Sequence, residues 1–527
     1  MLKVVIKQDA SWTRIDYRES SLWFKGYLYN KSVNDLLNEL PDLKSAFIAE
    51  YLSGLNGHFA FVFQNAQSTL VAVDRVRSIP VFYNEHEVCS NPTFLTKHTS
   101  VNHNAALSLK MAGYTIGEDT LYSGINSLTA GQFFFVDREG NLNRENYYQY
   151  KPWIPSSKKA TSEDLSKITL NILEKLIASL NGRQVIIPLS AGNDSRLIAS
   201  GLKHLGYKNV KCYSYGIPGN FEAQVAKIIA EKLGYEFKFI PLNLRDERKF
   251  YRSNEFKEYL AFAETFVAVP YFQSLSTIPR LRNWIDRDAV FVNGNTGDFI
   301  SGGHVSSIFL SGNSHKTDKE RLNIVNQANI DKNFSLWGFL KTEKNLKNIT
   351  AQLTSEVPVE LSEVDIDNEH GLYEYSEFKN RQSKYVISGQ RAYEFYGHEW
   401  RLPLWDESYL EFWERVPLNL KLNQKLYTDM LRTQNWGGVW DDDVPVNKKT
   451  IRPFWIVPLR ILIRAFFVLF GKKKWHRFEI IYFYYFMDVT RMMCSINYLS
   501  VLRAIFKEPR HHVSWQADEY LKSKNIK

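Results

Sequence analysis

Residues 185–206 read VIIPLSAGNDSRLIASGLKHLG, and this stretch predicts the fold of the chain around it. Residues 185–189 form a short apolar run typical of a buried parallel strand, whereas residues 196–205 have the apolar spacing of a helix. The small-residue loop between them, SAGNDS (residues 190–195), directs backbone N–H groups and two hydroxyls to one point, where the helix dipole favours an anion. We therefore predict a phosphate-binding loop. It differs from the GxxxxGK[ST] loop because no lysine follows.

The same alternation continues along the chain. Residues 210–219 are typical of a strand that ends in a Gly/Pro turn, residues 222–233 of a helix and residues 237–240 of a strand. This order predicts a doubly wound parallel sheet with ligands at the carboxyl ends of its strands. Residues 288–304, DAVFVNGNTGDFISGGH, repeat an apolar strand and a Gly-rich loop, in which Asp298 is placed to hold Mg²⁺ or, alternatively, is solvated on a surface loop.

Residues 1–150 alternate short β-rich runs with turns and predict stacked antiparallel sheets. Two stretches, LNGHFAFVFQNAQSTLVAVDRVRSIPVFYN and GEDTLYSGINSLTAGQFFFVDREG, resemble the class II glutamine amidotransferase domain. Enzymes with that domain use an N-terminal cysteine as nucleophile. The chain begins Met1-Leu2 and has no cysteine before Cys89, so we expect a scaffold or dimerisation role rather than glutamine hydrolysis.

Five motifs in order across residues 160–455 resemble the asparagine synthetase family, whose ATP pyrophosphatase loop reads SGGxDS. They are PLSAGNDSR, YGIPGNFE, NGNTGDFISGGH, GHEWRLPLWDESYLEFWERVPLNLKL and VNKKTIRPF. The resemblance implies an α/β chain with an N-terminal Ntn-hydrolase-like αββα domain (residues 1–150). A doubly wound parallel-sheet ATP pyrophosphatase domain of the adenine nucleotide alpha hydrolase-like type (160–455) would follow, and then a basic, aromatic-rich helical extension (456–527).

The resemblance implies ATP and Mg²⁺ as cofactors and assigns roles to named residues. Pyrophosphate and Mg²⁺ contacts fall on Ser190, Gly192, Asp194 and Ser195. The nucleoside part of ATP is expected at Leu189, Tyr215, Gly216, Asn293 and Gly294. Asp298 joins Asp194 as a Mg²⁺ ligand, and Lys448 or Lys449 stabilises charge that develops on the phosphates. Glu399 and Arg401 are expected to form a buried, structural ion pair.

Three residues depart from the family pattern. Ala191 replaces the second loop glycine, Phe299 a second acidic residue, and Asn295 a glutamate close to the reacting acyl centre. We therefore expect a ligase that adenylates a carboxylate other than aspartate, such as a uronic acid of a surface polysaccharide, and transfers the acyl group to ammonia or another amine. Two alternatives stay open: an asparagine synthase supplied with ammonia from elsewhere, and a catalytically silent ATP-binding or assembly protein.

The net charge of +9 is concentrated in residues 444–478, which contain nine Lys or Arg and no acidic residue, so we expect no nucleic-acid partner. Three scattered cysteines predict a cytoplasmic protein without disulfides or a zinc site. Residues 454–470 are apolar but too short, and with two arginines too charged, to span a membrane. Packing on the core is slightly favoured over peripheral contact of residues 454–478 with the inner membrane face. A homodimer stays open.

Overall fold

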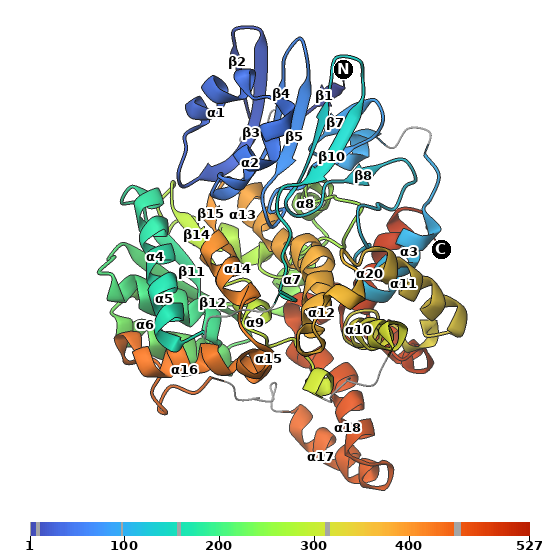
Figure 1. Cartoon of the computed structure of the whole chain (residues 1–527). Helices are drawn as coiled ribbons and strands as arrows, with labels where there is room; N and C mark the ends of the chain where they lie inside the picture. The colour runs from blue at the N-terminus through green and yellow to red at the C-terminus, as the bar shows by residue number, and fades with distance from the viewer. Residues whose placement is uncertain are drawn as a thin grey trace.

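The computed structural model describes residues 2–6, 11–95, 99–154, 160–310, 317–446 and 455–526, with the side chain of Met487 excepted. The first part of the chain forms two stacked sheets (Figure 1). One has the order β1 (Lys3–Val5), β7 (Glu87–Cys89), β6 (Phe82–Tyr83), β8 (Asn126–Ser127). The other has the order β10 (Leu142–Asn146), β9 (Gln132–Val136), β5 (Thr69–Val73), β4 (Gly57–Gln64), β3 (Ser20–Leu28), β2 (Thr13–Tyr17). Strand β1 pairs with β7 in parallel, so the predicted antiparallel pairing is wrong for this pair.

Both faces of the larger sheet are apolar, because alternate residues of a strand point to opposite sides. In β4, the rings of Phe59, Phe61 and Phe63 pack against helices α1 (Val33–Glu39) and α2 (Ile48–Ser53). Val62, from the other face of the same strand, belongs to the cluster shared with the smaller sheet, where the rings of Tyr83 and Phe134 lie 4.8 Å apart. The predicted stacked β-architecture is confirmed.

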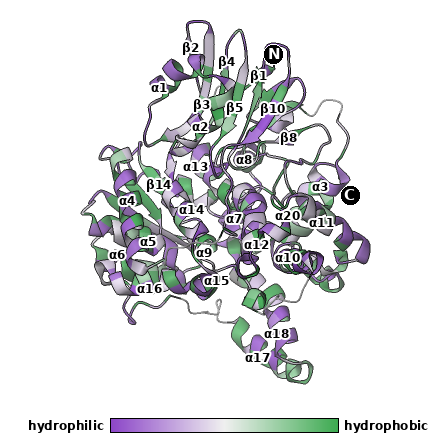
Figure 2. Ribbon diagram, viewed as in Figure 1, coloured by the Kyte–Doolittle hydropathy of each residue, from purple (hydrophilic) through white to green (hydrophobic). Residues whose placement is uncertain are grey.

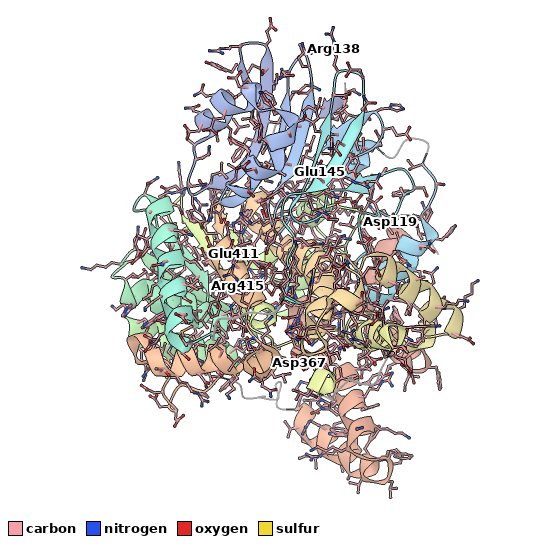
Figure 3. All side chains as sticks on the ribbon, viewed as in Figure 1. Asp119, Arg138, Glu145, Asp367, Glu411 and Arg415 are labelled. Atoms are coloured by element: carbon pink, nitrogen blue, oxygen red, sulfur yellow. The ribbon has the colours of Figure 1, made fainter. Side chains whose placement is uncertain are left out.

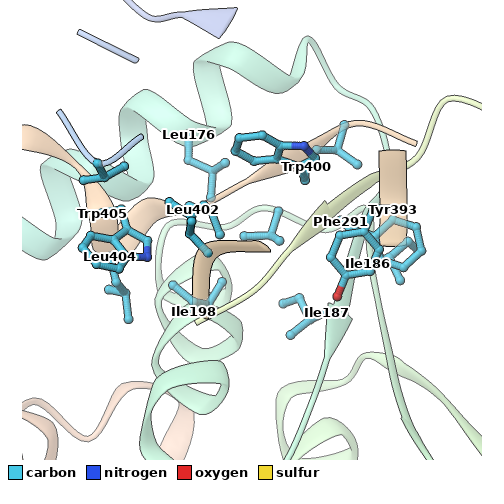
Figure 4. Packing of buried hydrophobic residues seen from close by; sticks show 14 of the residues in the cluster. Leu176, Ile186, Ile187, Ile198, Phe291, Tyr393, Trp400, Leu402, Leu404 and Trp405 are labelled. Atoms are coloured by element: carbon cyan, nitrogen blue, oxygen red, sulfur yellow. The ribbon is translucent and has the colours of Figure 1, made fainter. Parts of the chain in front are cut away.

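The second part contains a parallel sheet of order β13 (Glu236–Pro241), β12 (Val210–Gly216), β11 (Val185–Pro188), β14 (Val290–Val292), β15 (Trp400–Arg401). The chain runs outward from β11 to β13 and then returns to the other side of β11 as β14. Such a reversal creates a crevice at the carboxyl ends of the two neighbouring strands. Figure 4 shows the core at this sheet, where the rings of Phe291 and Tyr393 stack 4.4 Å apart. The predicted doubly wound sheet is confirmed.

Helices surround this sheet and fill the rest of the second part (Figure 1). Their bounds are α4 (Ser162–Leu180), α5 (Asn193–His204), α6 (Phe221–Leu233), α7 (Leu244–Phe250), α8 (Asn254–Phe262), α9 (Gly297–Ile300), α10 (Asp318–Lys332), α11 (Glu343–Ser355), α12 (His370–Glu377), α13 (Arg391–Phe395), α14 (Glu407–Glu414), α15 (Leu418–Lys421), α16 (Lys425–Gln434), α17 (Ile456–Phe467), α18 (Lys472–Phe478), α19 (Tyr498–Arg503) and α20 (Val513–Ser523). Helix α3 (His103–Ala112) belongs to the first part of the chain and packs against α11 and α20. A π-helical segment, η9 (Phe378–Val386), continues α12. Charged side chains such as Arg138 and Asp367 lie on the outside (Figure 3).

Buried polar contacts join the two parts. Lys25 from β3 forms a 2.8 Å ion pair with Glu394 of α13, and each side chain is only 5% exposed. The Lys384 ammonium donates hydrogen bonds to the backbone carbonyls of Thr115 (2.8 Å) and Gly117 (2.6 Å). Removing one member of such a buried pair leaves an uncompensated charge, so these contacts fix the orientation of the parts.

The structure corrects two further sequence predictions. Arg401 is buried, but the side chain of its 3.1 Å partner Glu399 is 55% exposed, so the pair is not a buried one. The slightly favoured packing of residues 454–470 on the core is also wrong for the described part, because α17 and α18 form a hairpin that projects from the body (Figure 1) with most of its side chains exposed. Among the described residues, no helix is long and apolar enough to cross a bilayer.

Candidate functional site

The loop between β11 and α5 gathers the two predicted serine hydroxyls. Ser190 donates its backbone N–H to Ser195 Oγ at 3.1 Å, and the two hydroxyl oxygens lie 3.2 Å apart. Gly192 is the N-cap of α5 and supplies no side-chain cap, while its own N–H donates to Ser190 Oγ at 3.2 Å. The N–H groups in the first turn of α5 therefore lack a capping side chain, which is the condition for binding an anion at a helix N-terminus.

The Gly-rich loop after β14 lies directly against this helix start. A Cβ atom added to Gly294 would come within 2.5 Å of the Asp194 carbonyl carbon, and one added to Gly297 within 2.4 Å of Asp194 Oδ1. Only glycine allows this approach. The backbone N–H of Asp298 donates to Asp194 Oδ2 at 3.0 Å, and the Tyr427 hydroxyl donates to Asp194 Oδ1 at 3.0 Å. The fold thus brings together the two aspartates predicted to bind Mg²⁺.

These carboxylates have the chemistry that Mg²⁺ requires. Burial, together with the charge of Asp298, raises the pKa of Asp194 to about 7, so an added cation would relieve an electrostatic penalty. Among the described residues, no group of three or more His, Cys, Asp or Glu could hold a metal ion by itself. Mg²⁺ characteristically uses one or two carboxylates together with substrate phosphates and water, and the pair Asp194 and Asp298 fits that pattern.

A charged network that the sequence analysis did not identify lies beside Asp298. His304 Nε2 is 3.3 Å from Asp298 Oδ2, and its Nδ1 contacts the buried Glu377 carboxylate. Burial alone would lower the pKa of His304, but Glu377 and Asp298 together raise it to about 9. Arg381 also donates to Glu377 at 3.0 Å. Near neutral pH, His304 therefore carries a positive charge close to the phosphate-binding loop.

The residues predicted to contact the nucleoside lie on both sides of the loop. Tyr215 and Gly216 end β12, and Asn293 and Gly294 follow β14, so both pairs flank the carboxyl end of β11. The Leu189 backbone N–H donates to the Tyr213 carbonyl at 2.8 Å, which ties the start of the loop to β12. The predicted nucleoside contacts thus converge on one edge of the sheet.

The C-terminal segment contributes a second feature that the sequence did not reveal. Burial raises the pKa of Tyr215 and of Tyr271. The positive charge of Arg491 opposes both shifts, so Arg491 lies close to Tyr215, one of the predicted nucleoside contacts. Arg491 Nε donates to Asp488 at 2.7 Å. A cavity of 350 Å³ is lined by Ile480, Ile481, Tyr484, Arg491, Met492, His511, His512 and Trp515.

Lys448 and Lys449 lie outside the described residues, so their role stays a prediction. The segment that precedes them is held by Arg196, the first residue after the loop serine. The buried Arg196 guanidinium donates to the carbonyls of Ala191 (2.6 Å), Val439 (3.0 Å) and Val444 (3.1 Å). The hydrogen bonds of Arg196 therefore hold residues 439–445 next to the phosphate-binding loop.

The departures from the family pattern have different surroundings. Phe299 is fully buried, with its ring 5.9 Å from that of His304, so an apolar contact occupies this position. The Asn295 backbone N–H donates to Asn293 Oδ1 at 3.0 Å, and a Cβ atom at Gly389 would lie 3.9 Å from Asn295 Nδ2. Asn295 thus lies next to the predicted nucleoside contacts.

Comparison with known protein families agrees with the first four of the five motifs, which lie within the matched residues. Residues 180–434 match the asparagine synthase family model. No curated protein sequence matches the chain. One similar solved structure is the glutamine phosphoribosylpyrophosphate amidotransferase from B. subtilis complexed with ADP and GMP, with 12% identity and a TM-score of 0.17 over 54% of this chain and 64% of that one. Another is the allosteric regulatory enzyme of purine biosynthesis, with 12% identity and a TM-score of 0.16 over 54% and 56% of the two chains. The chain thus spans less than two thirds of either structure.

Proposed function

We propose that this protein is an ATP-dependent amide-forming ligase, because residues 180–434 match the asparagine synthase family model. Asparagine synthases are a family of ATP-dependent carbon–nitrogen ligases. The proposal rests on the contact between the phosphate-binding loop and the Gly-rich loop. That contact brings the Ser190 and Ser195 hydroxyls, the uncapped start of α5, and the carboxylates of Asp194 and Asp298 to one edge of the sheet.

In the proposed reaction, the N–H groups at the start of α5 and the loop hydroxyls bind the β and γ phosphates of ATP. Asp194 and Asp298 would hold Mg²⁺, which supplies charge neutralisation of the phosphates when bound. A substrate carboxylate oxygen bonds to the α phosphorus while the bond to the bridging oxygen breaks and pyrophosphate leaves. An amine then attacks the acyl carbon, AMP departs, and the amine loses a proton. Catalysis rests on positioning and on electrostatic stabilisation.

We further propose that the substrate carboxylate is larger than aspartate. Asn295 stands where the family has a glutamate near the acyl centre, which disfavours aspartate as substrate. Arg491 lines the neighbouring cavity but also pairs with Asp488, so a carboxylate bound there would share the guanidinium with Asp488. The larger carboxylate that we propose is a uronic acid of a surface polysaccharide. The acceptor would be ammonia or a primary amine.

A second candidate is a silent ATP-binding or assembly protein. The specific observation in its favour is the loss of two acidic residues, at Asn295 and at the buried Phe299. Exchange of labelled pyrophosphate into ATP, screened over aspartate, uronic acids and other carboxylates, separates the two candidates. Carboxylate-dependent exchange supports the ligase, whereas ATP binding without exchange for any carboxylate supports the silent protein.

A further inference from the structure

The hairpin formed by α17 and α18, residues 455–478, carries an apolar outer surface that packs on nothing in the described structure. Its inner side is packed: the ring centroid of Phe467 lies 5.7 Å from that of Trp475 and 4.9 Å from that of Phe478, and Ile456 is fully buried. Arg460 pairs with Glu479 on this side. The hairpin therefore has its own small core, and its exposed surface is not a consequence of disorganised packing.

Large apolar side chains cover the outer side and the tip. Along α17, Leu459, Leu462 and Phe466 follow each other at intervals of three and four residues and are 47%, 70% and 60% exposed. At the tip, Val468 and Leu469 are 78% and 83% exposed. Contiguous apolar surface of this kind marks an interaction site rather than ordinary surface.

Basic residues adjoin this apolar surface. Lys472, Lys473 and Lys474 begin α18 immediately after the tip, and all are exposed, as is Arg464 on α17. Among the described residues, none of these three lysines forms an ion pair with a carboxylate. Figure 2 shows the hydrophobic α17 beside the hydrophilic residues of α18. An apolar tip bordered by cations matches an anionic lipid leaflet, where acyl chains lie below negative headgroups.

We propose that this hairpin docks the protein peripherally on an anionic membrane surface, with Leu462, Phe466 and Leu469 inserted at the level of the headgroups. The twelve residues of α17 span about 18 Å, well below the ~30 Å of a bilayer core, so the hairpin lies in the interface and does not cross it. Docking of a second copy through the same surface is disfavoured, because it would bring two clusters of lysines together. The inference does not depend on the proposed ligase activity.

Flotation of the full chain with vesicles tests the proposal. Binding is expected to phosphatidylcholine vesicles that contain phosphatidylglycerol, at low salt, and to weaken at high salt or on phosphatidylcholine alone. The K472Q/K473Q/K474Q variant should bind about 100-fold more weakly, since each lysine near an anionic leaflet contributes roughly 1 kcal/mol. Leu469→Glu should abolish flotation, because it places a carboxylate at the inserted tip.

Matched controls use exposed residues elsewhere. K319Q/K344Q/K347Q changes three exposed lysines, and Phe47→Glu changes a phenylalanine that is 54% exposed, and neither should alter flotation. The proposal is overturned if the wild-type chain stays unbound at low salt, or if the hairpin variants float as well as the wild type. It is equally overturned if sedimentation shows a dimer that Leu469→Glu dissociates while vesicles do not bind.

Discussion

His304 offers a quantitative test of the electrostatics beside the phosphate-binding loop. Its imidazole lies between Asp298 and the buried Glu377, and its side chain is only 13% exposed. The rise of its pKa from 6.5 to about 9 corresponds to about 3 kcal/mol in favour of the protonated form in the folded protein. A raised folded-state pKa stabilises the fold fully below pH 6.5, and this contribution is lost as the pH rises through about 9.

Two measurements follow from this reasoning, both in metal-free buffer. A ¹³C-histidine NMR titration, with the signal assigned by its absence in His304→Gln, should give a pKa near 9 for His304. The difference in unfolding free energy between wild type and His304→Gln should shrink by about 3 kcal/mol from pH ~6 to pH ~10.

Glu377→Gln provides the matched control, because it removes the larger of the two acidic influences on the imidazole. In that variant the pKa of His304 should fall markedly toward its ordinary range. A wild-type pKa at or below 6.5, or a pKa that Glu377→Gln leaves unchanged, would refute the proposed charge beside the loop.

Three further predictions concern the site and the first part of the chain. Gly294→Ala places a methyl group 2.5 Å from the backbone of Asp194 and should cost about 3 kcal/mol and abolish turnover, whereas Gly54→Ala, whose methyl group would lie 3.4 Å from the Tyr51 carbonyl oxygen, should be tolerated in the same unfolding and activity assays. Arg196→Met removes hydrogen bonds to the carbonyls of residues 191, 439 and 444 and should destabilise the protein by about 2–4 kcal/mol; unchanged hydrogen exchange at 439–446 would contradict this role. Glutamine should yield no glutamate with this chain, because its three cysteines are buried and burial raises the pKa of Cys89 to about 12; release above background would disprove the prediction.

The regular elements around the loop could be predicted because their signals are local. Helix α6 has the bounds predicted from its apolar spacing to within one residue, and the side chain of Asn220 caps it by accepting from the Ala223 N–H. The order of β11, β12 and β13 followed from alternating strands and helices. The proximity of Asp194 and Asp298 was implied by a family resemblance, and the structure adds the glycine contacts that permit it.

Features that depend on long-range packing could not be predicted. His304 and Glu377 are 73 residues apart in the sequence, and only the packing of α12 beside the Gly-rich loop brings them together. The family resemblance implied that Glu399 and Arg401 are both buried, but a sequence gives no measure of the exposure of each partner, and the Glu399 side chain is 55% exposed. Residues 454–470 have the apolar composition of a core helix. Their exposure depends on which other elements pack against them, and the sequence does not show this. The roles of Lys448 and Lys449 stay predictions.

Pyrophosphate exchange tests whether the loop at residues 190–195 is the ATP site. With the carboxylate identified by the screen, the wild-type chain should incorporate labelled pyrophosphate into ATP. Asp194→Asn should lose at least about 100-fold of that rate, because its side chain retains the size of the carboxylate but not its charge toward Mg²⁺. Full exchange activity in a folded Asp194→Asn protein would contradict the assignment of the loop at residues 190–195 as the ATP site.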